Sequence, residues 1–202
     1  MKDPVKIAVL VSGGGTNLQA IIDFAGAGNL KNGKIVKVIS SKDGAYALER
    51  AKNAGIEGVT VKRKGITQNE FEKGILNELE KCGAEVIVLA GFMCILSKDF
   101  TDRYKDRIIN VHPSLIPSFC GEGYYGLKVH EAALAYGVKV TGATVHFVNE
   151  VPDGGKIIMQ KAVEIEQNDT PEILQKRVME QAEWKILPAS LELVCESLRK
   201  GE

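Results

Sequence analysis

The chain has 202 residues, of which 45% are hydrophobic and 26% charged, as in an ordinary soluble globular domain. Lysine plus arginine and aspartate plus glutamate both number 26, so the net charge is zero and the basic excess of nucleic-acid or anionic-membrane binders is missing. The four cysteines form no C-x-x-C pair and no apolar run is long enough to span a membrane, so we expect a cytoplasmic protein without a disulfide framework or bound metal.

The first expected element is a buried strand over residues 5–12, followed by a turn of three glycines, Thr16 and Asn17 and then by a helix. Glycines let the backbone approach an anion, and a helix N-terminus offers free N–H groups, so this turn is a candidate phosphate site. We expect Thr16 and Asn17 to cap the helix and also to touch the phosphate. It is neither a Walker loop nor a dinucleotide fingerprint, because no lysine follows the glycines and Leu18 replaces the third glycine. A tight turn without a ligand explains these glycines equally well.

Strands and helices alternate along the rest of the chain. This order predicts an α/β fold with a doubly wound, mostly parallel sheet and helices on both faces, as one domain over residues 1–202. The further expected strands are 34–41, 58–61, 86–90, 107–112, 141–148 and 156–160, and the expected helices are 45–54, 67–81, 128–136 and a long one from Thr170 that Pro188 kinks or breaks.

Asn110 and His112 end the strand over residues 107–112, because Pro113 follows and cannot continue a central strand. Side chains two residues apart share a face, so an amide and an imidazole stand together where open α/β sheets bind ligands. Such a pair can stabilise an oxyanion or move a proton. From this stretch alone, a structural histidine beside a turn asparagine is slightly favoured.

Asp153 completes a possible trio with Asn110 and His112, although an aspartate before Gly154 is usually only a turn residue. A carboxylate near His112 would favour the imidazolium form. The apolar segment after the strand at 86–90 lines a pocket for a flat ring or belongs to the core, and the glycine- and aromatic-rich segment 118–126 is expected to be a mobile loop beside the site.

Four motifs in this order carry a resemblance to a known family: S-G-G-G-T-N-L-Q-A, L-A-G-F-M, N-V-H-P-S-L-I-P, and V-H-F-V followed by D-G-G. Over nearly its whole length the chain resembles the phosphoribosylglycinamide formyltransferases, the folate-dependent enzymes of purine synthesis. The resemblance implies that Asn110, His112 and Asp153 are catalytic. It also implies that Gly15, Thr16 and Asn17 hold the substrate phosphate, that Glu183 meets the glycinamide end, and that Met93, Cys94, Ile95, Leu96, Asn149 and Glu150 surround the folate.

Two positions depart from the family pattern. Cys94 stands where some members carry arginine, and the segment 119–126 is longer than in compact members. The resemblance implies transfer of a formyl group from 10-formyltetrahydrofolate, as co-substrate, to glycinamide ribonucleotide, by a monomer or weak homodimer that needs no metal.

The rival functions come from two classes. The first class is another formyl-folate enzyme, either a formyltetrahydrofolate hydrolase or a methionyl-tRNA formyltransferase, although each of these would carry an extra domain. The second class is a non-catalytic nucleotide-binding module that uses only the glycine turn. An intact set of Asn110, His112 and Asp153 argues against the module.

Overall fold

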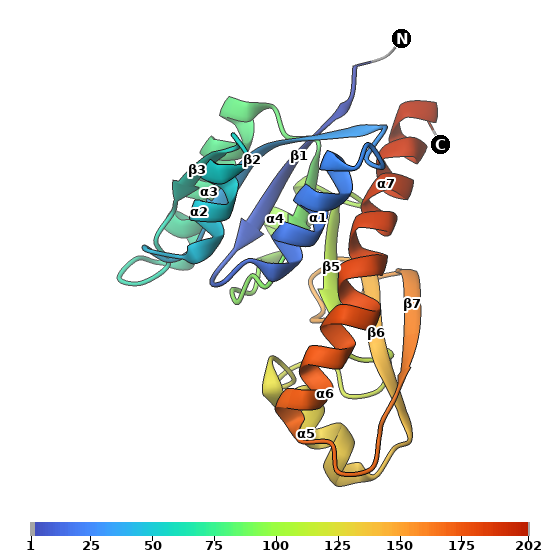
Figure 1. Cartoon of the computed structure of the whole chain (residues 1–202). Helices are drawn as coiled ribbons and strands as arrows, with labels where there is room; N and C mark the ends of the chain where they lie inside the picture. The colour runs from blue at the N-terminus through green and yellow to red at the C-terminus, as the bar shows by residue number, and fades with distance from the viewer. Residues whose placement is uncertain (1–2, 202) are drawn as a thin grey trace.

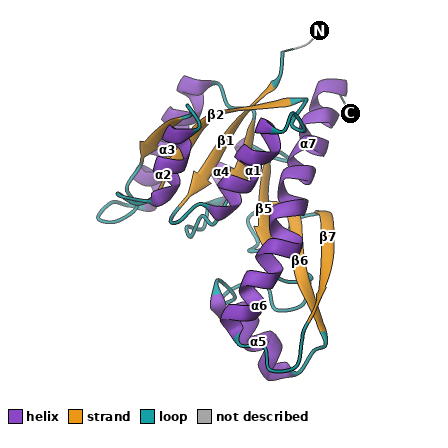
Figure 2. Ribbon diagram, viewed as in Figure 1, coloured by secondary structure: helices purple, strands orange, loops and turns teal. Residues whose placement is uncertain are grey.

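A computed structural model describes residues 3–201 as an α/β fold in which a seven-stranded sheet carries helices on both faces (Figures 1 and 2). The strands are β1 (Val5–Val11), β2 (Gly33–Ser40), β3 (Glu57–Thr60), β4 (Val86–Leu89), β5 (Ile108–His112), β6 (Val140–Phe147) and β7 (Ile157–Glu164). The helices are α1 (Thr16–Gly26), α2 (Tyr46–Asn53), α3 (Gln68–Cys82), α4 (Lys98–Arg103), α5 (Leu127–Tyr136), α6 (Pro171–Val178) and α7 (Trp184–Lys200), with a π-helical turn at Met179–Glu183 between the last two.

The strand order is β3-β2-β1-β4-β5-β6-β7. The first five strands are parallel, and β6 and β7 complete the sheet in antiparallel pairing. The predicted doubly wound, mostly parallel sheet is therefore confirmed. The chain reverses its direction of winding between β1 and β4, and ligands of such sheets bind outside the carboxyl ends of the strands at this switch point.

Alternate residues of the central strands enter two separate cores. Val9 and Val11 of β1 pack with residues of α1 and α7 on one face, while Leu10 packs on the other face with residues of α3 and α4 such as Phe71 and Phe100. All five side chains are almost completely buried. The period of two along a strand explains why an apolar run such as β1 needs helices on both sides.

Three helices begin at a side-chain cap, but α1 does not. Thr67, Ser97 and Thr170 each accept a hydrogen bond from a backbone N–H of the first turn of α3, α4 and α6. The N-cap of α1 is Gly15, in the left-handed region at φ 72°, and no side chain caps it. The expectation that Thr16 and Asn17 cap α1 is wrong, because both residues already lie inside the helix.

Two further features differ from the expectations. The short helix α4 was not predicted, because only Phe100 and Thr101 of its six residues are buried and no periodic apolar pattern forms. Pro188 lies inside α7 without breaking it. The departure from α-geometry lies just before it, where the Trp184 N–H reaches back five residues to the Met179 carbonyl. No helix within residues 3–201 is long and apolar enough to cross a membrane.

Candidate active site

Three polar side chains meet across β5 and β6. Asn110 and His112 lie on β5, and Asn110 faces His146 of the antiparallel strand β6, so all three share one face of the sheet. Asn110 Nδ2 lies 3.3 Å from His146 Nε2. His146 Nδ1 is bound to the Phe147 carbonyl at 2.7 Å, which leaves Nε2 as the atom that faces the site.

Asp153 joins these residues from the loop between β6 and β7. Its backbone is left-handed, with φ 55°, and this conformation turns the carboxylate towards the strands. Oδ2 lies 3.3 Å from His112 Nδ1, and Oδ1 lies 3.5 Å from His146 Nε2. The structure therefore brings Asn110, His112 and Asp153 together around His146, and only 13% of the Asp153 side chain is exposed.

The segment between β5 and α5 folds onto this cluster. The Phe119 carbonyl lies 2.8 Å from His112 Nε2, and the Gly121 N–H donates to Asp153 Oδ2 at 2.9 Å. Both ring nitrogens of His112 are thus engaged by the protein, and 4% of the residue is exposed. A substrate can reach His112 Nε2 only when the Phe119 carbonyl moves aside.

The site holds an imidazole that resists protonation beside a charged carboxylate. Burial lowers the pKa of His112 and outweighs the Asp153 charge and the Phe119 carbonyl, which both raise it. Burial raises the pKa of Asp153, but His146, His112 and the Gly121 N–H together lower it below its usual value. Asp153 thus acts on the pKa of His112 in the expected direction, and desolvation is the larger, opposing effect.

The glycine turn at the carboxyl end of β1 leads directly into α1. A Cβ added to Gly15 would lie 2.6 Å from the Ala47 side chain, so α2 packs against the turn too closely for any other residue. Thr16 is exposed, whereas Asn17 is 9% exposed and donates from Nδ2 to Glu183 Oε2 at 2.8 Å. Two of the residues expected to meet the ribonucleotide, Asn17 and Glu183, are therefore in contact.

Glu183 is a buried carboxyl group at the end of the π-helical turn. Only 7% of it is exposed, and burial raises its pKa to about 6, with the Asn17 amide opposing the rise. Because the folded-state pKa lies above the usual value of 4.5, the folded protein binds more protons between these pH values, and stability is lost as the pH rises through them. The rise corresponds to about 2 kcal/mol at neutral pH.

We therefore expect Glu183→Gln to be more stable than the wild type at pH 7.5, by up to about 2 kcal/mol, and the gain to shrink towards pH 4.5. The measurement is the free energy of unfolding in urea at several pH values. Glu180→Gln is the control, because Glu180 is an exposed residue of the same turn. Equal stabilities of wild type and Glu183→Gln across this pH range would contradict the buried charge.

The residues expected to surround the folate lie in two segments. Met93 and Ile95 are 55% and 70% exposed, whereas Leu96 is 5% exposed and packs in the core with Phe71. The Met93 N–H donates to Ser12 Oγ at 3.0 Å, which ties the segment after β4 to the end of β1. Met93 and Cys94 line one cavity, while Asn149 and Glu150 line a different one. Their roles towards the folate stay predictions.

His146 is the site residue to which the sequence assigned no role. The alternation in 141–148 predicts only that His146 shares a face with Thr144 and Val148. Its contact with Asn110 requires that β6 lie antiparallel beside β5. Spacing along the chain carries no signal for that pairing. Among residues 3–201, no group of three histidine, cysteine, aspartate or glutamate side chains is arranged to hold a metal ion.

A model of the formyl transferase family matches residues 5–191, and the chain belongs to this family. The phosphoribosylglycinamide formyltransferase of Haemophilus influenzae is 45% identical over 184 residues, which are 91% of this chain and 84% of that protein. The crystal structure of glycinamide ribonucleotide transformylase 1 from Symbiobacterium toebii aligns with a TM-score of 0.89 and 37% identity, over 96% of this chain and 89% of that one.

The chain also matches part of much longer proteins. The trifunctional purine biosynthetic protein adenosine-3 of Gallus gallus is 44% identical over 191 residues, which cover 94% of this chain but 18% of that protein. The human protein of the same name gives the same 18% coverage. The chain therefore spans less than a fifth of the length of these trifunctional relatives.

Proposed function

We propose that this chain transfers the formyl group of 10-formyltetrahydrofolate to the amine of glycinamide ribonucleotide, in purine biosynthesis, as one formyltransferase domain. The observation that carries the proposal is the cluster of Asn110, His112 and Asp153 at the carboxyl end of β5, at the same edge of the sheet as the glycine turn. The relatives that the chain covers over most of their length bear the name of this activity.

The residue types match the chemistry of the transfer. The substrate amine attacks the formyl carbon and a tetrahedral oxyanion forms, to which the Asn110 amide donates a hydrogen bond. Neutral His112 takes the proton of the amine, and the Asp153 carboxylate stabilises the resulting imidazolium. The bond from the formyl carbon to the folate nitrogen then breaks, and the proton goes to that nitrogen.

We assign the folate to the segment after β4. Because the Leu96 side chain is buried in the core, Leu96 contacts the folate through its backbone. The cavity beside Met93 and Cys94 has a volume of about 610 Å³, and its lining carries four basic side chains and one carboxylate, that of Asp43, which pairs with Lys62. These cations suit the carboxylates of a folate, so a positive charge is available although position 94 is a cysteine. The basic lining residues are Lys42, Lys62, Arg63 and Lys64.

The assay that tests the proposal follows folate absorbance with glycinamide ribonucleotide and 10-formyltetrahydrofolate. We expect folate turnover only when both are present. Turnover without the ribonucleotide would identify a formyltetrahydrofolate hydrolase instead, and ribonucleotide binding without any turnover would identify a binding module.

A substitution in the glycine turn is expected to change the KM for glycinamide ribonucleotide but not the KM for formyl-folate. Gly15→Ala places a methyl group against Ala47 at a left-handed position, so the turn must shift and the phosphate contacts with it. We expect the KM for glycinamide ribonucleotide to rise more than about tenfold, and the KM for formyl-folate to change little. Gly26→Ala, at the end of the same helix, is the control because its Cβ meets nothing within 4 Å. Equal rises in both constants would contradict the assignment.

A further inference from the structure

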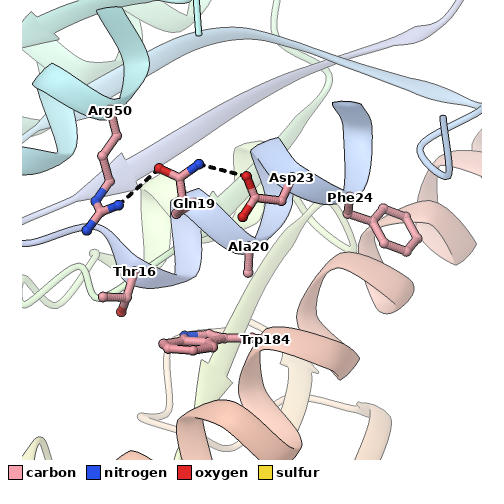
Figure 3. A pocket seen from close by; sticks show the side chains of 7 residues that line it. All are labelled: Thr16, Gln19, Ala20, Asp23, Phe24, Arg50 and Trp184. Atoms are coloured by element: carbon pink, nitrogen blue, oxygen red, sulfur yellow. Dashed lines mark hydrogen bonds between the residues drawn. The ribbon is translucent and has the colours of Figure 1, made fainter. Parts of the chain in front are cut away.

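Arg50 of α2 is bound to the glycine turn and to α1. Its Nε donates to the Gly14 carbonyl at 2.8 Å, and its Nη1 donates to Gln19 Oε1 at 3.0 Å. Gln19 in turn donates from Nε2 to Asp23 Oδ1 at 2.8 Å, as Figure 3 shows. The guanidinium is therefore held in one orientation at the start of α1, by one group of the glycine turn and one of α1.

The charge of Arg50 is not neutralised by a direct partner. No carboxylate of the described residues forms a salt bridge with it, and Asp23 is linked to it only through Gln19. Its other close neighbour is the Tyr46 ring, whose centroid lies 5.0 Å from the guanidinium carbon. A positioned cation without a carboxylate partner suits an anion that comes from outside the protein.

Arg50 and Thr16 line the same cavity, which has a volume of about 400 Å³. Gln19, Ala20, Asp23, Phe24 and Trp184 also line it, and Figure 3 shows the Trp184 ring facing α1 across this space. The uncapped first turn of α1 lies at the Arg50 end. Free backbone N–H groups and an unneutralised guanidinium thus meet at one end of one cavity.

We propose that Arg50 is a binding residue for the substrate phosphate, which it contacts together with the backbone of Gly15, Thr16 and Asn17. The inference rests on the proposed function for the identity of the phosphorylated substrate. Gln19 is a positioning residue, because its Oε1 accepts a hydrogen bond from the guanidinium and so fixes its orientation. A phosphate dianion takes the charge-assisted hydrogen bonds that the Gly14 and Gln19 contacts leave available on the planar guanidinium.

A purely structural role for Arg50 makes a different prediction. If Arg50 only fastens the turn, through its paired contacts with the Gly14 carbonyl and Gln19, its charge has no effect on phosphate binding, and a lysine, which lacks the planar guanidinium, cannot reproduce both contacts. If the charge binds the phosphate, Arg50→Lys retains part of the affinity that Arg50→Gln loses.

The experiment measures the Kd of ribose 5-phosphate by calorimetry for the wild type, Arg50→Gln, Arg50→Lys and the control Lys52→Gln, an exposed cation on the same helix. We expect a Kd about tenfold higher for Arg50→Gln, partial recovery in Arg50→Lys, and a wild-type value for Lys52→Gln. Because this titration needs no folate and no turnover, it tests Arg50 even if the transfer reaction itself is not observed.

Steady-state kinetics extend the test to the reaction. We expect Arg50→Gln to raise the KM for glycinamide ribonucleotide while kcat and the KM for formyl-folate stay near their wild-type values. A Kd for ribose 5-phosphate that is unchanged in Arg50→Gln would overturn the proposal. It is equally overturned if Arg50→Lys binds no better than Arg50→Gln, because the loss would then come from the turn and not from the charge.

Discussion

Replacing Asp153 by asparagine is expected to lower the turnover number roughly 10²- to 10⁴-fold, while both KM values change little. Asparagine also suits a left-handed turn before glycine, so the fold should survive. What is lost is the carboxylate 3.3 Å from His112 Nδ1, which in the proposed reaction stabilises the imidazolium that forms when the amine loses its proton.

The pH profile separates this role from a role in the turn. The Asp153 charge raises the pKa of His112 against the larger effect of burial, so its removal lowers that pKa further. The acid limb of kcat against pH should therefore move to lower pH in Asp153→Asn. Asp106→Asn is the matched control, because Asp106 has nearly the same backbone conformation, with φ 57° against 55°. A folded Asp153→Asn protein with wild-type turnover would make Asp153 a turn residue only.

Replacing Asn110 by alanine is expected to lower kcat roughly 10²- to 10³-fold, the effect of removing one donor to a developing oxyanion. The substrate constants should change much less, because this hydrogen bond strengthens only in the transition state. Asn110→Asp is the informative companion, since it keeps the shape of the side chain and replaces the donating amide by an acceptor.

We expect Asn110→Asp to be at least as impaired as Asn110→Ala, with circular dichroism spectra like that of the wild type. The comparison is made by single-turnover kinetics, which isolate the chemical step. If Asn110→Asp retained most of the activity, donation from this amide to the oxyanion would be wrong, and its contact with His146 would be the remaining role.

The parts of the fold that the sequence predicted are those whose burial leaves a local pattern. β1 and β4 are apolar runs because helices cover both of their faces, and α3 carries both its apolar stripe and its capping box. The pairing direction of β6 and β7 leaves no such pattern, because alternation is the same in parallel and antiparallel strands. The short helix α4 depends on its Ser97 cap and on the burial of Phe100, and neither feature leaves a periodic pattern in the sequence.

The candidate site likewise contains residues whose proximity the sequence predicts and residues whose proximity it does not predict. Asn110 and His112 share a face by their spacing alone, so their proximity was predictable. The approach of Asp153 depends on a left-handed residue in a loop, and the role of Arg50 depends on α2 lying across the glycine turn. Contacts between distant segments are set by tertiary packing, so the sequence offered Asp153 only as a possible partner until the resemblance to a known family supported it, and nothing pointed to Arg50.

The π-helical turn between α6 and α7 has a consequence for how this site can vary. Buried positions step by four residues from Leu174 through Val178 to Ala182, and again by four from the adjacent Glu183 through Leu187 to Leu191, so the second series is offset from the first by one residue. In a regular α-helix, one additional residue would rotate everything after it by about 100° and carry the apolar stripe of α7 away from the sheet. The widened turn absorbs that residue, so both helices keep their register against the core. Deletion of one residue here would return the segment to a regular α-helix and change the side chain that faces Asn17, while both helices keep their register against the core.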